Sequence, residues 1–302
     1  MVNNHEITIG IPSGGRLTKL NNCIDSIISN TTVPYNILII DNGTSPLNQN
    51  SISRNDVEIN IVSNLQQMSP SESRQYIFYN AKTDYIFFID EDMEVTSQSI
   101  NIFFNILNEN SHIDIIGGYL KENFYEYPIG YYIGTGLQNN TRGAWKEPIS
   151  RRRLVRTKIL IYKVDFMHPP FLVRKNIINK VNFDDNYKWG SELFDFFFQC
   201  KFNNIQCYVN PLVKFLHYPG KYKDTTFKNN REKNNYAGKI YFIKKWDIHI
   251  SNELRATYFD IFFFRLNRLI LSLQKFVSLK IFFMKMSLIL LIIIYIILLE
   301  FL

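Results

Sequence analysis

The sequence predicts an α/β fold in which a mostly parallel sheet is flanked by helices. In the first 120 residues, short apolar runs alternate with amphipathic stretches, an order that places helices on both faces of a parallel sheet. Two of the apolar runs end in acids, one at Asp41 and one at Asp90, Glu91 and Asp92. Open α/β sheets bind ligands at the carboxyl ends of their strands, so the same pattern predicts where a site lies.

The expected elements alternate regularly through the first half and less regularly afterwards. Pro12 closes the first strand because proline has no N–H for a sheet ladder, and Ser69 with Pro70 suits a helix start. After residue 120 the pattern loosens, and a turn is expected at Pro211. The expected strands are residues 6–12, 35–40, 57–62, 84–89, 113–120, 159–162 and 206–209, and the expected helices are residues 17–29, 69–80 and 97–109.

Three consecutive carboxylates, Asp90, Glu91 and Asp92, follow the fourth expected strand. Like charges at this density repel unless a cation lies among them, and such oxygen ligands suit Mg²⁺ or Mn²⁺. A solvated acidic turn is the simpler alternative. The residues before and after the triplet decide between the two.

Composition places the chain among folded proteins, with 46% hydrophobic and 20% charged residues in a length of 302. The net charge of +7 is unevenly distributed. Residues 1–141 hold 6 Lys and Arg against 15 Asp and Glu, whereas residues 142–302 hold 28 against 12. A basic half predicts a polyanionic partner, either nucleic acid or an anionic membrane.

The C-terminal residues favour the membrane over nucleic acid. Residues 286–302 are an apolar run with one acid, at the lower length limit for spanning a bilayer. Residues 258–285 mix Phe and Leu with regularly placed Lys and Arg, which is typical of a helix among lipid headgroups. We therefore expect residues 251–302 to be a helical membrane-associating tail. A buried core helix is the alternative for the last segment.

Cysteine usage and missing motifs narrow the class of protein. Cys23, Cys200 and Cys207 are odd in number and lack metal-ligand spacing, which predicts free thiols in a reducing compartment. We expect no signal peptide, because the first apolar run is short and leads directly into structure. The sequence contains no P-loop, HExxH or GxSxG motif. No motif therefore supports a P-loop ATPase, a zinc protease or a serine hydrolase.

Two features of the second half are candidates for catalysis or metal binding. Glu192 and Asp195 are three residues apart at an expected helix start, where they share a face and suit the positive end of the helix dipole. For this segment taken alone, simple pairing with the helix dipole is the favoured explanation. His217 is a lone histidine after the strand at 206–209, and lone histidines are more often structural than ligands.

Taken in order, these segments resemble the family-2 glycosyltransferases, which have the GT-A fold. The strand ending at Pro12 with Arg16 after it resembles the family's first strand and turn, and the strand ending at Asp41 resembles its second. Arg74 matches the family's Arg-Asn element, with Gln75 in place of Asn.

Later motifs continue the resemblance, which covers residues 6–220. The triplet 90–92 is similar to the family's D-x-D motif, and Glu192 ends a Trp-Gly-Ser-Glu stretch similar to the element that supplies the catalytic base. His217 falls where many members carry a metal-binding His. Leu193 replaces the second acid found in many members, which leaves the base open between Glu192 and Asp195.

The resemblance implies inverting, metal-dependent transfer of a hexose from a nucleoside diphosphate donor, UDP by family precedent, to a glycan or lipid-linked acceptor. The implied donor-binding residues are Pro12, Arg16, Asp41, Arg74, Asp90 and Glu91, the implied ligands of Mn²⁺ or Mg²⁺ are Asp90, Asp92 and His217, and the implied base is Glu192 or Asp195.

Domain organisation and location follow from the same resemblance and from the tail. Residues 1–120 are expected to bind the nucleotide sugar, residues 121–250 to bind the acceptor and supply the base, and residues 251–302 to hold the enzyme on the cytoplasmic face of a membrane. Two alternatives stay open: a catalytically degenerate, membrane-attached sugar-nucleotide or glycan-binding protein, and a Mg²⁺-dependent nucleotidyltransferase.

Overall fold

A computed structural model describes residues 5–250, except for 44, 53, 55–56, 64–67, 124, 139–140 and 221–224. The described residues all belong to one compact unit. The expected membrane-associating tail lies outside the described residues. Within the described part of the chain, no helix is long and apolar enough to cross a membrane.

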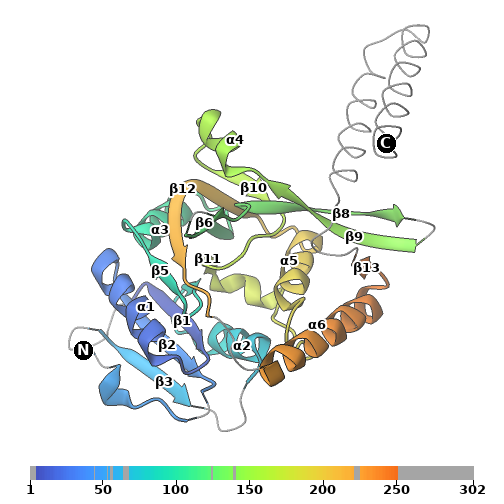
Figure 1. The fold of residues 1–302 in the computed structure, drawn as a ribbon. Coiled ribbons are helices and arrows are strands. Elements are labelled where there is room, and N and C mark those ends of the chain that lie inside the picture. Colours follow the sequence, from blue (N-terminus) through green and yellow to red (C-terminus); the bar gives the residue numbers. More distant parts are fainter. Residues whose placement is uncertain are drawn as a thin grey trace, which may run out of the picture. The chain divides into compact units, whose positions relative to one another are not determined.

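A large mixed sheet forms the middle of the fold; its strands pair in parallel from β4 through β1 and β2 to β3, and antiparallel β11 lies between β4 and β6 (Figure 1). Its strand order is β10-β12-β6-β11-β4-β1-β2-β3, with β5 paired to β12 and β7 paired to β6. The strands are β1 (Ile7–Ser13), β2 (Tyr35–Asp41), β3 (Ile59–Ser63), β4 (Tyr85–Phe88), β5 (Met93–Val95), β6 (Ile115–Glu122), β7 (Tyr125–Glu126), β10 (Tyr162–Val164), β11 (Phe171–Arg174) and β12 (Cys207–His217).

The rest of the fold is a second sheet and the helices. The second sheet has the order β13-β9-β8, from β8 (Gly130–Gln138), β9 (Thr141–Ile149) and β13 (His249–Ile250). The α-helices are α1 (Leu17–Asn30), α2 (Pro70–Asn80), α3 (Ser99–Glu109), α4 (Arg151–Arg156), α5 (Glu192–Phe202) and α6 (Thr225–Trp246), with short 3₁₀ turns at Gln49–Ser51 and Lys175–Asn179.

The first half matches the sequence-based expectation closely, and the α2 start shows why. Ser69 accepts a hydrogen bond from the backbone N–H of Glu72, and the Glu72 carboxylate accepts one from the N–H of Ser69. This reciprocal capping box, with Pro70 at the first helical position, satisfies N–H groups that a helix start leaves without partners. Gly10 lets α2 approach β1, because a Cβ there would lie 2.4 Å from Ile77 Cγ2.

The second half departs from the expectation at four places. The turn expected at Pro211 is instead an irregularity inside β12, where the pairing with β6 shifts register between Val209 and Lys214. Bulges are where a sheet tolerates proline, so the strand continues to His217. The strand expected at 159–162 begins only at Tyr162. Antiparallel β11 and the β8–β9 hairpin were not expected.

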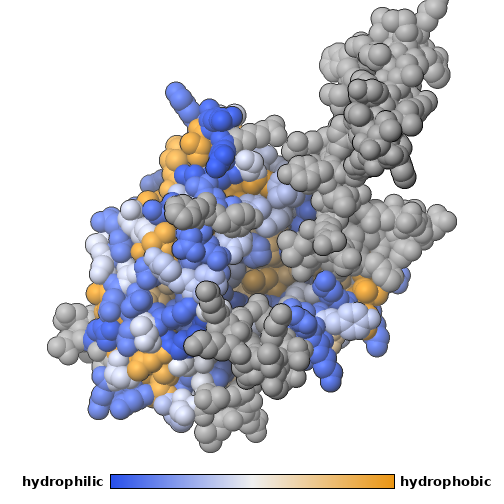
Figure 2. Space-filling view, viewed as in Figure 1, coloured by the Kyte–Doolittle hydropathy of each residue, from blue (hydrophilic) through white to orange (hydrophobic). Residues whose placement is uncertain are grey.

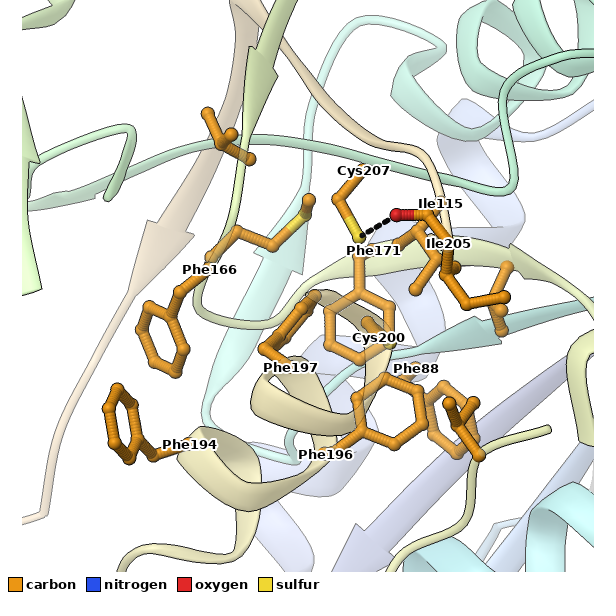
Figure 3. Close-up of a cluster of buried hydrophobic side chains, with 14 of the residues drawn as sticks. Phe88, Ile115, Phe166, Phe171, Phe194, Phe196, Phe197, Cys200, Ile205 and Cys207 are labelled. Atoms are coloured by element: carbon orange, nitrogen blue, oxygen red, sulfur yellow. Dashed lines mark hydrogen bonds between the residues drawn. The ribbon is translucent and has the colours of Figure 1, made fainter. Parts of the chain in front are cut away.

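An aromatic core joins β4, β11 and α5 (Figure 3). Phe183 and Phe196 stack with ring centroids 4.2 Å apart, and Phe171 meets Phe197 edge-on at 5.5 Å. Buried aromatic pairs of this kind add about 0.5–1.5 kcal/mol beyond their area burial. The acidic triplet and the start of α5 therefore rest on one rigid cluster.

The three cysteines are free and buried, in agreement with the sequence-based expectation of free thiols. Cys200 and Cys207 belong to the same aromatic core, where the thiol of Cys207 donates a weak hydrogen bond to the carbonyl of Ile205 (Figure 3). Burial raises the pKa of the Cys23 and Cys200 thiols. These groups are inert packing residues at neutral pH.

Candidate functional site

The two acidic strand ends meet at one rim of the sheet. Ser13 lies opposite Asp41 in the parallel β1–β2 register, and β4 lies on the other side of β1. The loops after β1 and β2 touch, because a Cβ at Gly15, whose φ is +80°, would lie 2.6 Å from the Cα of Gly43. Only glycine adopts this backbone conformation without cost, and only glycine leaves room for the neighbouring chain.

Asp41 is 2% exposed, and the loop that follows it holds its carboxylate in place. Its carboxylate accepts hydrogen bonds from the N–H groups of Gly43 at 2.9 Å and Leu47 at 2.8 Å. The loop after β2 is thereby shaped around the carboxylate. Pro12 lies beside it on β1, paired with Ile40.

Arg16 connects the first loop to the acidic triplet. Its Nε donates to Oε1 of Glu91 at 2.5 Å, and its Nη2 donates to Oδ2 of Asp92 at 3.0 Å. The hydroxyl of Ser13 donates to the other oxygen of Glu91 at 2.6 Å. Burial alone would lower the pKa of Arg16, but Glu91 and Asp92 outweigh it and raise that pKa.

The triplet therefore divides into different roles. Glu91 is 2% exposed and has both oxygens engaged, so it fixes the loop. The Asp92 side chain is 12% exposed and that of Asp90 is 31% exposed. These two carboxylates face the rim and are the members of the triplet that can meet a ligand.

Arg74 on α2 joins the triplet to the start of α5. Its Nη2 donates to Oδ1 of Asp90 at 2.7 Å, and its Nη1 lies 3.5 Å from Oε1 of Glu192. The Arg74 side chain is only 5% exposed. Its Nε and Nη1 are buried with no hydrogen-bond acceptor in the described part of the chain, so the guanidinium has capacity left for a ligand oxygen.

The chain enters α5 through two residues in the left-handed conformation. Gly190 has φ +70° and Ser191 has φ +64°. A side chain at Gly190 would collide with Asn235 of α6, and one at Gly238 would lie 2.7 Å from the carbonyl oxygen of Gly190. A non-glycine residue with positive φ costs free energy and persists where the surrounding structure enforces it, a situation common at functional sites.

Asp195 lies one helical turn after Glu192 but in different surroundings. It is completely buried and accepts four side-chain hydrogen bonds. The donors, with their distances, are Tyr187 at 3.1 Å, Gln199 at 2.7 Å, Lys245 at 2.9 Å and Trp246 at 2.6 Å. Burial and the Asp195 carboxylate raise the pKa of the Tyr187 hydroxyl, so this group remains a donor.

His217, the last residue of β12, lies beside Asp92. Its Nε2 is 3.8 Å from Oδ1 of Asp92, and the backbone N–H of Tyr218 donates to the carbonyl of Asp92 at 2.8 Å. The carboxylate oxygen is a donor that suits Mn²⁺ or Mg²⁺, and the imidazole nitrogen lies beside it as a second donor. In the described part of the chain, no cluster of three or more His, Cys, Asp or Glu forms a complete metal site.

Three rim residues were missed by sequence reasoning. Ser13 and Glu122 contact expected site residues, and Lys19 donates to the backbone carbonyl of Tyr218. Glu122 ends β6, so the rule that pointed to Asp41 also applied to it. The expected strand stopped at residue 120, two residues too early, and Glu122 was therefore overlooked.

The fold and this rim define a GT-A-type glycosyltransferase. The family model for glycosyl transferase family 2 matches residues 8–181, more than half of the 302 residues, and the chain belongs to this family. The resemblance found from the sequence motifs is thus confirmed. No curated protein sequence matches the chain.

A solved structure supports the fold independently. A crystal structure of GalNAc-T7 with UDP, GalNAc and Mn²⁺ is similar, with a TM-score of 0.57 and 16% sequence identity. The match covers 72% of this chain and 44% of that chain, so this protein spans less than half the length of its neighbour. At this identity the likeness establishes the shared fold.

Proposed function

We propose that this protein transfers a hexose from a nucleoside diphosphate donor, preferably a UDP-sugar, to a glycan or lipid-linked acceptor with inversion at the anomeric carbon. The observation that carries the proposal is the ion-pair chain from Asp90 through Arg74 to Glu192. Asp90, which belongs to the acidic triplet, and the candidate base Glu192 pair with the same guanidinium, and this supports a donor site and a base at one rim.

Asp92 and His217 would hold a divalent cation, Mn²⁺ or Mg²⁺, with Asp90 turned towards it and towards the ribose. When bound, the cation neutralises charge on the diphosphate leaving group. Mg²⁺ and similar ions commonly bind through one or two protein groups together with substrate phosphates and water. The small number of protein donors at this rim agrees with such a shared site.

Glu192 is the better of the two candidate bases. The acceptor hydroxyl loses a proton as it attacks, so a carboxylate must be within reach of it. Glu192 is at the rim beside Arg74, whereas Asp195 is enclosed by four donors. One base and one direct displacement give inversion without a covalent intermediate.

Donor recognition would come from Asp41, Arg74 and Arg16. Asp41 shapes the loop against which the nucleobase would rest, and Arg74 has buried donors available for the base or the diphosphate. Acceptor recognition would fall to residues 121–180, which include the β8–β9 hairpin. Nothing in this region resembles a nucleic-acid-binding motif, so we propose no nucleic-acid partner.

A thermal-shift titration tests the donor and the metal together. UDP, GDP and dTDP, each with Mn²⁺ and with EDTA, are added to the full-length protein. We expect UDP with Mn²⁺ to raise the melting temperature most and UDP with EDTA to have little effect, because the carboxylates repel the diphosphate. Equal affinity for UDP in Mn²⁺ and in EDTA would remove the metal from the proposal.

The proposed place of action is the cytoplasmic face of a membrane. Around α4, the exposed residues combine positive charge with apolar side chains: Arg152, Arg156, Lys158, Val155, Leu160 and Leu212. Figure 2 shows this mixture of hydrophilic and apolar surface around α4. Basic residues near an anionic surface contribute about 1 kcal/mol each.

Truncation after Asn252 tests the contribution of the tail. The shortened protein keeps α6 and should remain folded, bind UDP and leave the membrane fraction, while the full-length protein stays with membranes at low salt. Recovery of the full-length protein in the soluble fraction would refute the membrane proposal. Unfolding of the shortened protein would show that the tail belongs to the core.

One observation favours the alternative of a catalytically degenerate binding protein. The Arg16 guanidinium already pairs with Asp92 and Glu91, so its positive charge partly neutralises these carboxylates, as a bound metal ion would. Sugar transfer, or hydrolysis of the donor, that disappears in Asp92→Ala would exclude this alternative. Family membership argues against the nucleotidyltransferase alternative.

A further inference from the structure

The end of β6 lies next to the end of β12, and this register brings Glu122 to His217. Leu216 pairs with Lys121 in the parallel β6–β12 ladder, so the following residues of the two strands are neighbours. Oε2 of Glu122 lies 3.5 Å from Nδ1 of His217. The other ring nitrogen, Nε2, lies 3.8 Å from Asp92. The imidazole thus stands between two carboxylates.

Glu122 is itself held in place by Tyr127. The Tyr127 hydroxyl donates to Oε2 of Glu122 at 2.5 Å, and the Tyr127 ring meets the His217 ring edge-on with centroids 6.0 Å apart. One tyrosine therefore orients both the carboxylate and the imidazole. The antiparallel pairing of Glu122 with Tyr125 forms the short turn that brings Tyr127 back.

The two carboxylates compete unequally for the single proton of a neutral imidazole. Asp92 already accepts a hydrogen bond from the Arg16 guanidinium, whereas Glu122 accepts one from an uncharged hydroxyl. Nδ1 of His217 is buried and has no hydrogen-bond acceptor at normal distance in the described part of the chain, and Glu122 is the group it faces. Both facts favour placing the proton on Nδ1.

We propose that Glu122, supported by Tyr127, is a positioning residue that fixes the Nδ1–H tautomer of His217 and so presents Nε2 to the divalent cation held with Asp92. The inference rests on the metal assignment in the proposed function. A carboxylate behind a ligand histidine fixes the ring and raises its basicity, and loss of such a group typically weakens metal affinity about 10–100-fold.

The test titrates Mn²⁺ into full-length protein saturated with UDP and measures affinity by calorimetry. Glu122→Ala should weaken Mn²⁺ affinity about 10–100-fold. Glu122→Gln, which retains an acceptor without charge, should recover part of it, and Tyr127→Phe should lose less than either. Glu126→Gln is the matched control, since Glu126 is similarly exposed but pairs with Arg151, and it should equal wild type.

The second readout is the tautomer itself. In ¹⁵N spectra of the metal-free protein, His217, assigned by its absence in His217→Ala, should show a protonated Nδ1 that Glu122→Ala converts to a protonated Nε2. If His217→Ala weakens Mn²⁺ binding and Glu122→Ala does not, the positioning role is refuted and the metal site stands. If neither variant changes Mn²⁺ affinity, the metal assignment fails and the inference fails with it.

Discussion

Glu192 and Asp195 lie one turn apart at the start of α5, yet they belong to different regions of the molecule. Glu192 faces the rim, where Arg74 and Asp90 are its neighbours. Asp195 faces α6, where Lys245 and Trp246 enclose it. We propose opposite tasks for these two carboxylates, with Glu192 at the rim as the base and Asp195, which accepts four side-chain hydrogen bonds, as a structural anchor.

Glu192→Gln should have the largest effect of all the changes at these two carboxylates. The amide keeps the shape but cannot accept the proton, so transfer should fall about 10²–10⁴-fold. Donor binding, measured by calorimetry with UDP and Mn²⁺, should stay near wild type. Asp195→Asn serves as the counterpart. If it abolishes transfer while remaining folded, and Glu192→Gln turns over normally, the roles of the two carboxylates are reversed.

Asp195→Ala should act on stability. Removing one member of a buried ion pair costs about 3–5 kcal/mol when its partner is left uncompensated. Lys245 keeps its ion pair with Asp184 at 2.7 Å and its side chain is 24% exposed, so we expect the lower end, about 3 kcal/mol. Urea unfolding measures this loss in the free energy of unfolding. Asp25→Ala, which breaks the exposed pair with Arg54, should cost less than about 1 kcal/mol.

Trp246→Phe tests a single one of the hydrogen bonds that hold Asp195 in place. The ring still packs against Phe198 and Phe202, but the N–H to Asp195 is lost. Hydrogen bonds to charged groups contribute about 1.5–3 kcal/mol, so unfolding free energy should fall by about that amount. Tyr79→Phe, at a side chain that is 59% exposed, should leave it unchanged. An unchanged stability in Trp246→Phe would contradict the anchor role.

The smallest expected effect is a pH dependence around Asp184. Burial would raise the pKa of this carboxyl, but hydrogen bonds from Lys245 and Asn186 outweigh it and lower that pKa below 3.8. Asp184 therefore stabilises the fold above pH 3.8, and this contribution is lost as the pH falls through the folded-state pKa. Asp184→Asn should flatten the loss of stability in acid.

Asp185 provides a control of opposite sign. Burial and the nearby charges of Glu72 and Asp184 raise the pKa of Asp185. Its ionisation opposes folding as the pH rises above 3.8, so Asp185→Asn should steepen the rise of stability with pH. Denaturant titrations between pH 2.5 and 6 measure both slopes. Equal slopes for the two variants would contradict the assignment.

Much of the first half could be predicted because its signals are local. The capping box at Ser69, the strand ending in Asp41 and the apolar run before Asp90 each identify an element without reference to distant residues. The family's motifs lie on these elements. That is why the candidate site could be named before its geometry was known.

The parts that could not be predicted depend on contacts between distant segments. Asp195 became an anchor because α6, about 50 residues later, supplies Lys245 and Trp246. Spacing alone put Asp195 beside Glu192, and no local pattern reveals four donors. The strand through Pro211 was missed for the same reason, since the bulge that accommodates the proline is defined by pairing with β6.

The close approach of Gly190 and Gly238 has a mechanical consequence. Backbone touches backbone there, with no side chain to absorb a shift. A displacement of α6 by the width of a methyl group would push directly on the strained turn that leads into Glu192. The contact between Gly190 and Gly238 therefore couples the position of α6 directly to the turn that precedes the candidate base.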